Sequence, residues 1–304
     1  MRTASLRADF LLLVTAAIWG VSFVAQRVGM EYLGPFTFNG LRFGLGSLSL
    51  LPLIYFAPQW GQPDQLPKYS FQLWSGVLAG IVLFGGASLQ QAGMIWTTAG
   101  KAGFITGLYV LMVPILGLIW RNFPPLGTWL GTALAAIGLY FLSVGEEFTL
   151  SRGDGLVLFS AIFWAAHVLL IARLASRVNV IKLSAAQFAV CSILSLAVAF
   201  LVEEVRLELI VDAAVPVLYG GFGSVGIAYT LQVIAQKDAP PAHTAIILSL
   251  EGAFAAMGGW LILDELLSFR ALFGCGLILL GMLISQLYPY ILVARQKRAM
   301  KRVG

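Results

Sequence analysis

The feature that most constrains this chain is a succession of ten apolar stretches, each about as long as the hydrocarbon core of a membrane. A helix needs about 20 apolar residues to cross that core. Short links with proline, glycine and charged residues separate the stretches, such as "NFPPLG" before the fifth and "KDAPPAH" before the ninth. The pattern predicts an all-α membrane protein with ten transmembrane helices. They are expected at about residues 8–27, 36–56, 70–94, 98–120, 124–143, 154–172, 181–201, 213–235, 240–262 and 269–292.

Composition supports an integral membrane protein and excludes several other classes. The chain of 304 residues is 59% hydrophobic and 11% charged, whereas soluble proteins are roughly half apolar and a quarter charged. Cys191 and Cys275 stand apart in two apolar stretches, so we expect no disulfide framework, no metal site and no cofactor. Much of the net charge of +5 comes from the end, "ARQKRAMKRVG". We interpret this end as a cytoplasmic tail beside the lipid bilayer and expect no nucleic-acid partner.

The distribution of charge predicts the orientation. Lysine and arginine accumulate on the cytoplasmic side of membrane proteins. With ten spans and both termini cytoplasmic, basic residues such as Arg7, Lys68 and Lys237 fall inside, and acidic residues such as Glu203 and Glu208 fall outside. Removing one helix from the middle would scramble this partition. The start of the chain resembles a signal peptide but has no small-residue cleavage site in the right place, so we interpret it as the first membrane helix.

The two halves of the chain are weak copies of each other. A shift of 145 residues places Asp9 on Asp154, Trp19 on Trp164 and Arg42 on Gln187, and a shift of 143 places Gly131 on Gly274 and Gly138 on Gly281. We therefore expect a first repeat at 1–147 and a second at 148–304. Five helices is an odd number, so the second copy enters the membrane upside down. Inverted repeats are typical of secondary transporters, whose binding site lies near the midplane between the halves.

Polar side chains within the predicted spans mark the candidate binding site, because they are costly inside a membrane. In the first span Trp19, Ser22 and Gln26 recur at helical spacing, and the eighth span repeats this spacing with Tyr229, Gln232 and Gln236. These stripes predict a shared cavity among the first, third, fourth, sixth, eighth and ninth helices, and a packing or dimer face on the fifth and tenth. The substrate-binding candidates are Trp19, Ser22, Gln90, Gln91, Thr106, Trp164, His167, Tyr229, Gln232 and Glu251.

Several of these residues allow a structural interpretation as well. Arg42, in "NGLRFGLG", could snorkel to the interface, make a structural hydrogen bond, pair with Glu251 or meet a charge on the substrate. Glu251 lies midway along its span, where snorkelling is difficult, and is a candidate for transport or proton coupling. His167 and His243 could carry protons or pack as polar groups. The glycines of "GGFGSVG" fit the dinucleotide fingerprint, but no βαβ unit can surround them, so we interpret them as a helix-packing face.

The order of these motifs resembles the EamA branch of the drug/metabolite transporter superfamily. The motifs are "AAIWGVSF" in the first span, "LRF" in the second, "FITGLYVLMVPILG" in the fourth and "AIILSLEGAFAAMGGWLILDELLSFRALFG" near the end. The resemblance implies ten helices in two inverted five-helix repeats and a bacterial inner-membrane location. It also implies export of amino acids or other small metabolites, often by exchange with a proton.

Two positions depart from the family pattern. The family motif Leu-Gly-Glu remains only in the second half, as Leu263-Asp264-Glu265. The family's glutamate before proline appears here as Glu251-Gly252, and the first half has Val113-Pro114 instead. If this carboxylate matters, only the second half supplies it, and the two halves are functionally unequal.

The leading hypothesis is a secondary transporter that exports a small polar or amphipathic metabolite by alternating access. The alternative is a non-transporting sensor or assembly protein on a transporter fold. An enzyme is not expected, because the sequence has no nucleophile motif or metal-ligand spacing to accompany its histidines. The substrate, the direction of transport, the role of protons and the oligomeric state all stay open.

Overall fold

The computed structural model describes residues 2–63, 67–97, 99–119, 121, 123–143, 151–263 and 268–303, and every regular element in these ranges is a helix. The first half contains α1 (Arg2–Gly29), α2 (Pro35–Ser49), α3 (Leu51–Phe56), α4 (Tyr69–Gly93), α5 (Ala99–Gly107), α6 (Tyr109–Ile119) and α7 (Leu126–Ser143). The second half contains α8 (Arg152–Leu174), α9 (Val180–Val202), α10 (Leu207–Asp212), α11 (Ala214–Leu218), the π-helix η1 (Tyr219–Tyr229), α12 (Thr230–Ala235), α13 (Pro241–Leu248), α14 (Glu251–Leu263) and α15 (Phe269–Val303).

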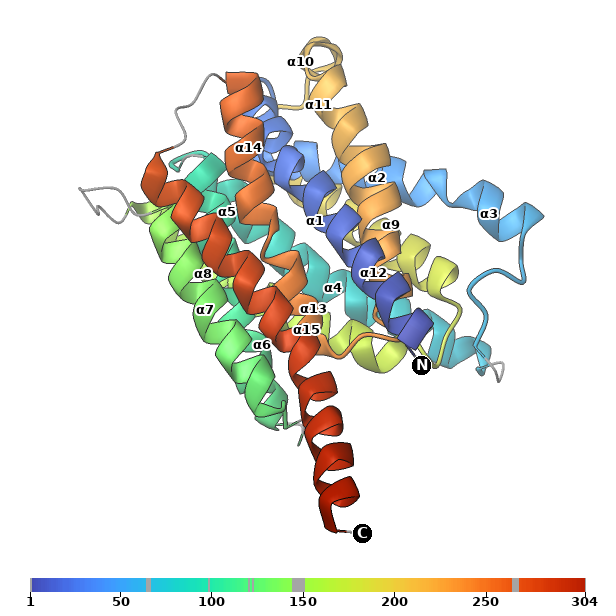
Figure 1. Ribbon diagram of the computed structural model, residues 1–304. Coiled ribbons are helices and arrows are strands. Elements are labelled where there is room, and N and C mark those ends of the chain that lie inside the picture. The colour runs from blue at the N-terminus through green and yellow to red at the C-terminus, as the bar shows by residue number, and fades with distance from the viewer. Residues whose placement is uncertain are drawn as a thin grey trace.

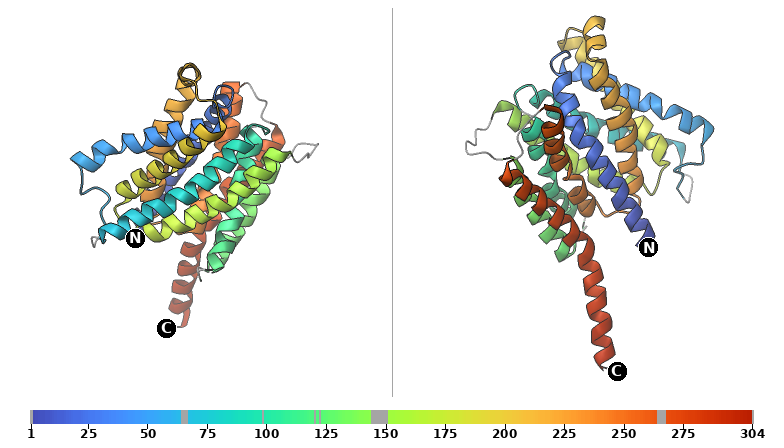
Figure 2. Two further views of the ribbon diagram at one scale, coloured as in Figure 1. Left: turned by 180° about the vertical axis from the view of Figure 1, so that it is seen from behind. Right: turned by 45° about the horizontal axis from the view of Figure 1, so that its top comes forward.

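This is a multi-pass membrane protein by the length and apolarity of its helices. Within the described residues, seven helical segments are long and apolar enough to cross a membrane, and two shorter apolar helices accompany them, Leu126–Phe141 and Leu272–Ser285. Asp264, Glu265 and the acidic pair Glu146 and Glu147 lie outside the described residues. Both ends of the described chain lie at the same end of the bundle (Figures 1 and 2).

The predicted span at 36–56 is not one continuous helix. It is divided into α2 and α3 at Leu50. Pro52 has no N–H, so it cannot donate to the carbonyl of Leu48 as an unbroken helix would require. The first of these helices packs against the bundle, whereas α3 extends away from it (Figure 1).

Two further spans are interrupted near their midpoints, at equivalent places in the two halves. The span at 98–120 breaks at Leu108, whose N–H donates to the carbonyl of Ile105, three residues back, at 3.2 Å. The span at 240–262 breaks at Ser249 and Leu250, where the Ser249 hydroxyl donates to the carbonyl of Ile246 at 2.7 Å. Such a bond competes with the helical ladder. As a result, α6 and α14 each begin inside the bundle.

The packing of α7 on α15 follows the two-fold relation that the repeats predict. A Cβ atom added to Gly131 would lie 2.5 Å from the carbonyl oxygen of Gly281, and one added to Gly138 would lie 2.6 Å from that of Gly274. Gly131 therefore meets Gly281, the repeat equivalent of Gly138, and Gly138 meets Gly274, the repeat equivalent of Gly131. Two helices related by a two-fold axis make such reciprocal contacts. Small residues allow this close approach, which is how membrane helices associate without burial from water.

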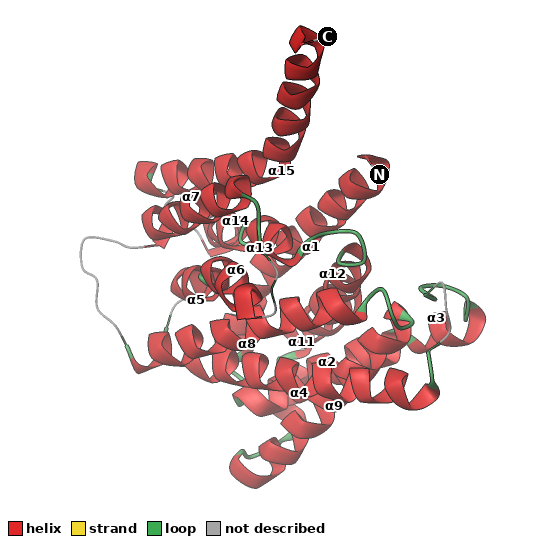
Figure 3. Cartoon of the chain, turned by 90° about the horizontal axis from the view of Figure 1, so that it is seen from below, coloured by secondary structure: helices red, strands yellow, loops and turns green. Residues whose placement is uncertain are grey.

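The packing of α2 on α9 has the same symmetry, now in hydrogen bonds. The Ser192 hydroxyl donates to the carbonyl of Gly40 at 2.7 Å, and the Ser47 hydroxyl donates to that of Ala185 at 2.9 Å. The shift of 145 residues relates Ser47 to Ser192 and Gly40 to Ala185. The α2–α9 pair and the α7–α15 pair lie on opposite sides of the bundle, and the remaining long helices fill the space between them (Figure 3).

Candidate functional site

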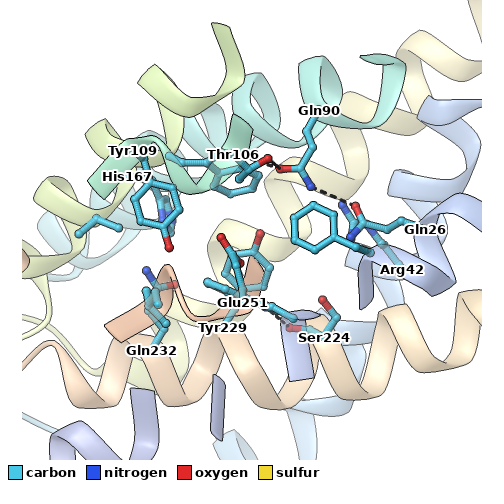
Figure 4. Close-up of a pocket in the computed structure, with 15 residues that line it drawn as sticks. Gln26, Arg42, Gln90, Thr106, Tyr109, His167, Ser224, Tyr229, Gln232 and Glu251 are labelled. Atoms are coloured by element: carbon cyan, nitrogen blue, oxygen red, sulfur yellow. Dashed lines mark hydrogen bonds between the residues drawn. The ribbon is translucent and has the colours of Figure 1, made fainter. Parts of the chain in front are cut away.

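A cavity lies between the two halves and is lined by side chains from both (Figure 4). Its free volume of about 30 Å³ is room for about two water molecules. A metabolite as large as an amino acid needs more space than this. The lining residues are Trp19, Phe23, Gln26, Arg42, Gln90, Thr106, Tyr109, Trp164, His167, Val168, Ser224, Tyr229, Gln232, Leu248 and Glu251.

The aromatic wall of the cavity is centred on Tyr229, at the end of η1. Its ring centroid lies 4.5 Å from that of Trp19 and 6.1 Å from that of Trp164, the two tryptophans that the repeat equates. The rings of Phe43 and Phe188 lie behind it, with centroids at 6.0 and 5.9 Å. Both tryptophans therefore lie within the bundle, away from the interface where tryptophan usually gathers. The wall suits apolar or aromatic parts of a ligand.

Gln90 joins four helices at the edge of the cavity. Its Oε1 accepts hydrogen bonds from Trp164 Nε1 at 2.8 Å and from the Thr106 hydroxyl at 3.3 Å. Its Nε2 donates to Gln26 Oε1 at 3.2 Å. These contacts link α4 to α8, α5 and α1, so Gln90 orients several lining side chains at once.

His167 and Gln232 bring further polar groups to the cavity. His167 is almost completely buried, and its Nε2 lies 2.8 Å from Gln187 Oε1. The Gln232 side-chain oxygen is buried and has no hydrogen-bond partner among the described residues. Buried polar atoms normally have partners, so this acceptor is available to a ligand or to water.

Glu251 and Tyr109 stand at the two interrupted spans, because they are the first residues of α14 and α6. Both side chains are 3% exposed. Glu251 Oε1 and the Tyr109 hydroxyl have no hydrogen-bond partner among the described residues. Figure 4 shows Glu251 beside Tyr229 in the middle of the cavity, with Arg42 and Gln26 toward one end. The helix breaks therefore present an acidic group to the space between the halves.

Arg42 does not snorkel. It is 2% exposed and lines the cavity, so the prediction that its stem could carry the guanidinium to the interface is wrong. Glycines explain the inward position. The Gly40 and Gly44 face packs on α9, and a Cβ atom on Gly220 of η1 would lie only 3.3 Å from the Arg42 Cβ atom. No ion pair joins Arg42 to Glu251 in the described part of the chain.

Three predicted site residues lie outside the cavity lining. The Ser22 hydroxyl accepts a hydrogen bond from Gln26 Nε2 at 3.3 Å, and Gln91 Nε2 donates to the Gln26 carbonyl at 3.3 Å. Ser22 and Gln91 thus hold Gln26 in place from both sides. His243 lies elsewhere, with Nε2 at 2.9 Å from Asp9 Oδ1 and Nδ1 at 3.1 Å from the Ser285 hydroxyl. It connects α13 to α1 and α15.

The structure adds lining residues that were not among the site candidates. The polar ones are Gln26, Tyr109 and Ser224, and the apolar ones are Phe23, Val168 and Leu248. Gln26 and Tyr109 belong to polar stripes that the sequence does display. Ser224 does not belong to a polar stripe with a period of 3.6 residues. It lies in the π-helix, whose i→i+5 hydrogen bonds widen each turn.

The side chains that line the cavity supply groups suited to binding an organic solute. No group of three or more His, Cys, Asp or Glu residues that could hold a metal ion occurs among the described residues. The lining combines one guanidinium, one carboxyl, amides, hydroxyls and aromatic rings. Such a lining can bind an organic solute by charge, hydrogen bonds and ring contacts.

Comparisons with known proteins agree with this architecture. The model of the EamA-like transporter family matches residues 6–144 and 151–287, one match in each half. An uncharacterized transporter of Archaeoglobus fulgidus is 33% identical over 283 residues, which are 93% of this chain and 86% of the relative. The uncharacterized transporter YoaV of Bacillus subtilis is 22% identical and covers 88% of this chain. A solved crystal structure aligns with a TM-score of 0.77 at 18% identity, over 94% of this chain and 98% of the other.

Proposed function

The chain belongs to the EamA-like transporter family, and from that premise we propose that it exports amino acids or related small metabolites by alternating access. The observation that carries the proposal is the small cavity between the repeats, lined from both sides by charged, amide and aromatic groups. Its size requires the halves to move before a metabolite can enter or leave.

The two-fold pairs at α2–α9 and α7–α15 support such a movement. In each pair, exchanging the two repeats gives back the same contacts between the same two helices. The rest of the inter-half surface can then exchange between two equivalent arrangements, one open to each side, as inverted repeats allow. In this proposal the protein has ten membrane helices and cytoplasmic termini and lies in the bacterial inner membrane. The small-molecule substrate binds at the cavity.

Counterflow in proteoliposomes tests the proposal. Vesicles loaded with mixed metabolites receive labelled amino acids singly, and uptake is compared with and without the internal load. Uptake that requires an internal substrate is the expected result. Binding of a solute without any flux, by protein that remains folded, would favour the non-transporting sensor or assembly protein instead.

Proton coupling is the finer part of the proposal, and Glu251 is its candidate carrier. A carboxyl at 3% exposure with one unpartnered oxygen is costly to keep charged inside a membrane. We expect the counterflow of wild-type protein to differ between two pH values and that of Glu251→Gln to be nearly the same at both. A pH dependence that survives in Glu251→Gln would remove this residue from the coupling step.

A further inference from the structure

Arg42 presents a fixed cation with free donors to the cavity. Its Nε donates to Asn39 Oδ1 at 2.9 Å, and Asn39 Nδ2 in turn donates to the carbonyl of Ala87 at 3.0 Å. The guanidinium carbon lies 4.9 Å from the ring centroid of Phe43 and 5.6 Å from that of Phe38. The described residues supply no hydrogen bond to either terminal nitrogen and no carboxylate within salt-bridge distance. The Nε of the guanidinium is therefore held by Asn39, and its two terminal nitrogens are available to bind a ligand.

A purely structural arginine would not need this arrangement. Buried charges are normally paired, because an unpaired charge in a membrane is expensive. Ring contacts and one side-chain amide orient the guanidinium but supply no opposite charge next to it. The planar fork of terminal N–H groups matches a carboxylate in a bidentate contact. A ligand carboxylate would therefore complete the surroundings of Arg42.

Glu251 is the second charged residue of the cavity lining, and it limits which anions can bind. A positive Arg42 and an ionised Glu251 would together carry no net charge. A bound carboxylate adds one negative charge, which is costly in an enclosed apolar site. A ligand ammonium group can offset that charge, or Glu251 can take a proton from water. The other titratable groups of the lining are Tyr109, His167 and Tyr229.

We propose that Arg42 binds the carboxylate of the substrate and selects for it, while Glu251 balances the charge. A zwitterion then binds with Glu251 ionised, because its ammonium group supplies the positive charge. A monoanion binds with Glu251 protonated, so its complex holds one more proton than the complex of the zwitterion. This inference rests on the proposed function, since it assigns the chemistry of that same cavity.

Three probes of one shape separate the charges: L-phenylalanine, 3-phenylpropionate, which lacks the ammonium group, and L-phenylalaninamide, which lacks the carboxylate. Binding is measured by isothermal titration on the full chain in lipid nanodiscs. We expect the wild type to bind the two carboxylates at least about tenfold more tightly than the amide, in line with hydrogen bonds to charged groups. Binding of phenylpropionate should take up one more proton from a weak buffer than binding of phenylalanine does.

The variants decide the assignment. Arg42→Gln should lose the preference for carboxylates, and Arg42→Lys, which keeps the charge without the fork, should retain part of it. Arg27→Gln, the same change at a basic residue outside the cavity lining, should bind like the wild type. Glu251→Gln should abolish the difference in proton uptake between phenylpropionate and phenylalanine. Gel-filtration profiles and melting temperatures identify any variant that fails to fold, and Arg42→Lys then carries the test.

Two results would overturn the inference: equal affinity of wild-type protein for the amide and the amino acid, or an Arg42→Gln variant with unchanged preference for carboxylates. Because these measurements need no flux, they separate from the transport proposal. Carboxylate selectivity without counterflow would refute the transport proposal and support the role of Arg42. Counterflow without carboxylate selectivity would support the transport proposal and refute the role of Arg42.

Discussion

The close contact between α7 and α15 makes a testable energetic prediction at Gly281. A Cβ atom added there would lie 2.5 Å from the carbonyl oxygen of Gly131, 3.2 Å from the backbone nitrogen of Ala135 and 3.3 Å from Leu134 Cβ. Gly276, on the same helix, has nothing within 4 Å of an added Cβ atom. Gly281→Ala and Gly276→Ala are therefore the same chemical change in one helix, with and without a neighbour.

The expected difference follows from the contact distance. Ordinary carbon–oxygen contacts between packed helices lie at about 3.3–3.6 Å, so Gly281→Ala must separate α7 from α15 locally by about 1 Å. The obstructing atom belongs to a helical backbone and cannot rotate away. Overpacking of this kind costs about 1–3 kcal/mol. Both variants gain the same helix propensity from alanine, about 0.5–1 kcal/mol, so the gain cancels in the comparison.

Reversible unfolding in mixed micelles of detergent and SDS, followed by far-ultraviolet circular dichroism, measures this difference. We expect Gly281→Ala to unfold at a lower SDS fraction than the wild type, and Gly276→Ala to match or exceed the wild type. The free energies of unfolding of the two variants should differ by about 1–3 kcal/mol. Equal unfolding curves for the two variants would refute the reasoning, because they would mean that the backbones do not touch at Gly281.

Three other predictions follow from the described contacts. Ser47→Ala and Ser192→Ala should each lower the free energy of unfolding by about 0.6 kcal/mol, the average for hydrogen bonds between membrane helices. Their double variant should be additive to within about 0.5 kcal/mol, and strong coupling in the SDS assay would contradict two separate bonds. Gln90→Leu should raise the KM for counterflow by about tenfold, because it removes three hydrogen bonds that orient the lining; an unchanged KM would make Gln90 only structural. In intact cells, an impermeant maleimide should label Leu207→Cys and reach Trp60→Cys only after permeabilisation, since the charge distribution places Leu207 outside and both positions are exposed; the opposite labelling would invert the proposed topology.

Much of the membrane architecture can be inferred from the sequence. The bilayer forces each spanning segment to satisfy its own backbone, so long apolar stretches must become helices. Polar stripes at helical spacing then mark the faces that avoid lipid. Trp19, Trp164 and Tyr229 were predicted in this way, and Glu251 was predicted as a carboxyl in the middle of a span; all four line the cavity. The correspondence of Gly131 with Gly274 is likewise visible in the sequence alone.

Tertiary structure decided the position of Arg42. Its place in the sequence allowed an interfacial head or a buried one, and the period of a helix does not distinguish them. The contacts of α2 with α9 and with Gly220 of η1 place the side chain at the cavity. Likewise, Ser224 reaches the lining from a π-helix, whose wider turn no 3.6-residue pattern anticipates.

The sequence by itself determined which segments are helical, how the halves repeat and which faces are polar, because these depend on each segment and its solvent. Only the tertiary structure decided where the helices break, which glycines meet and that Arg42 and Glu251 share a cavity without pairing. Membrane helices gain little from apolar burial against one another, so their arrangement depends on close contacts and hydrogen bonds between distant residues. Those contacts exist only in the assembled fold.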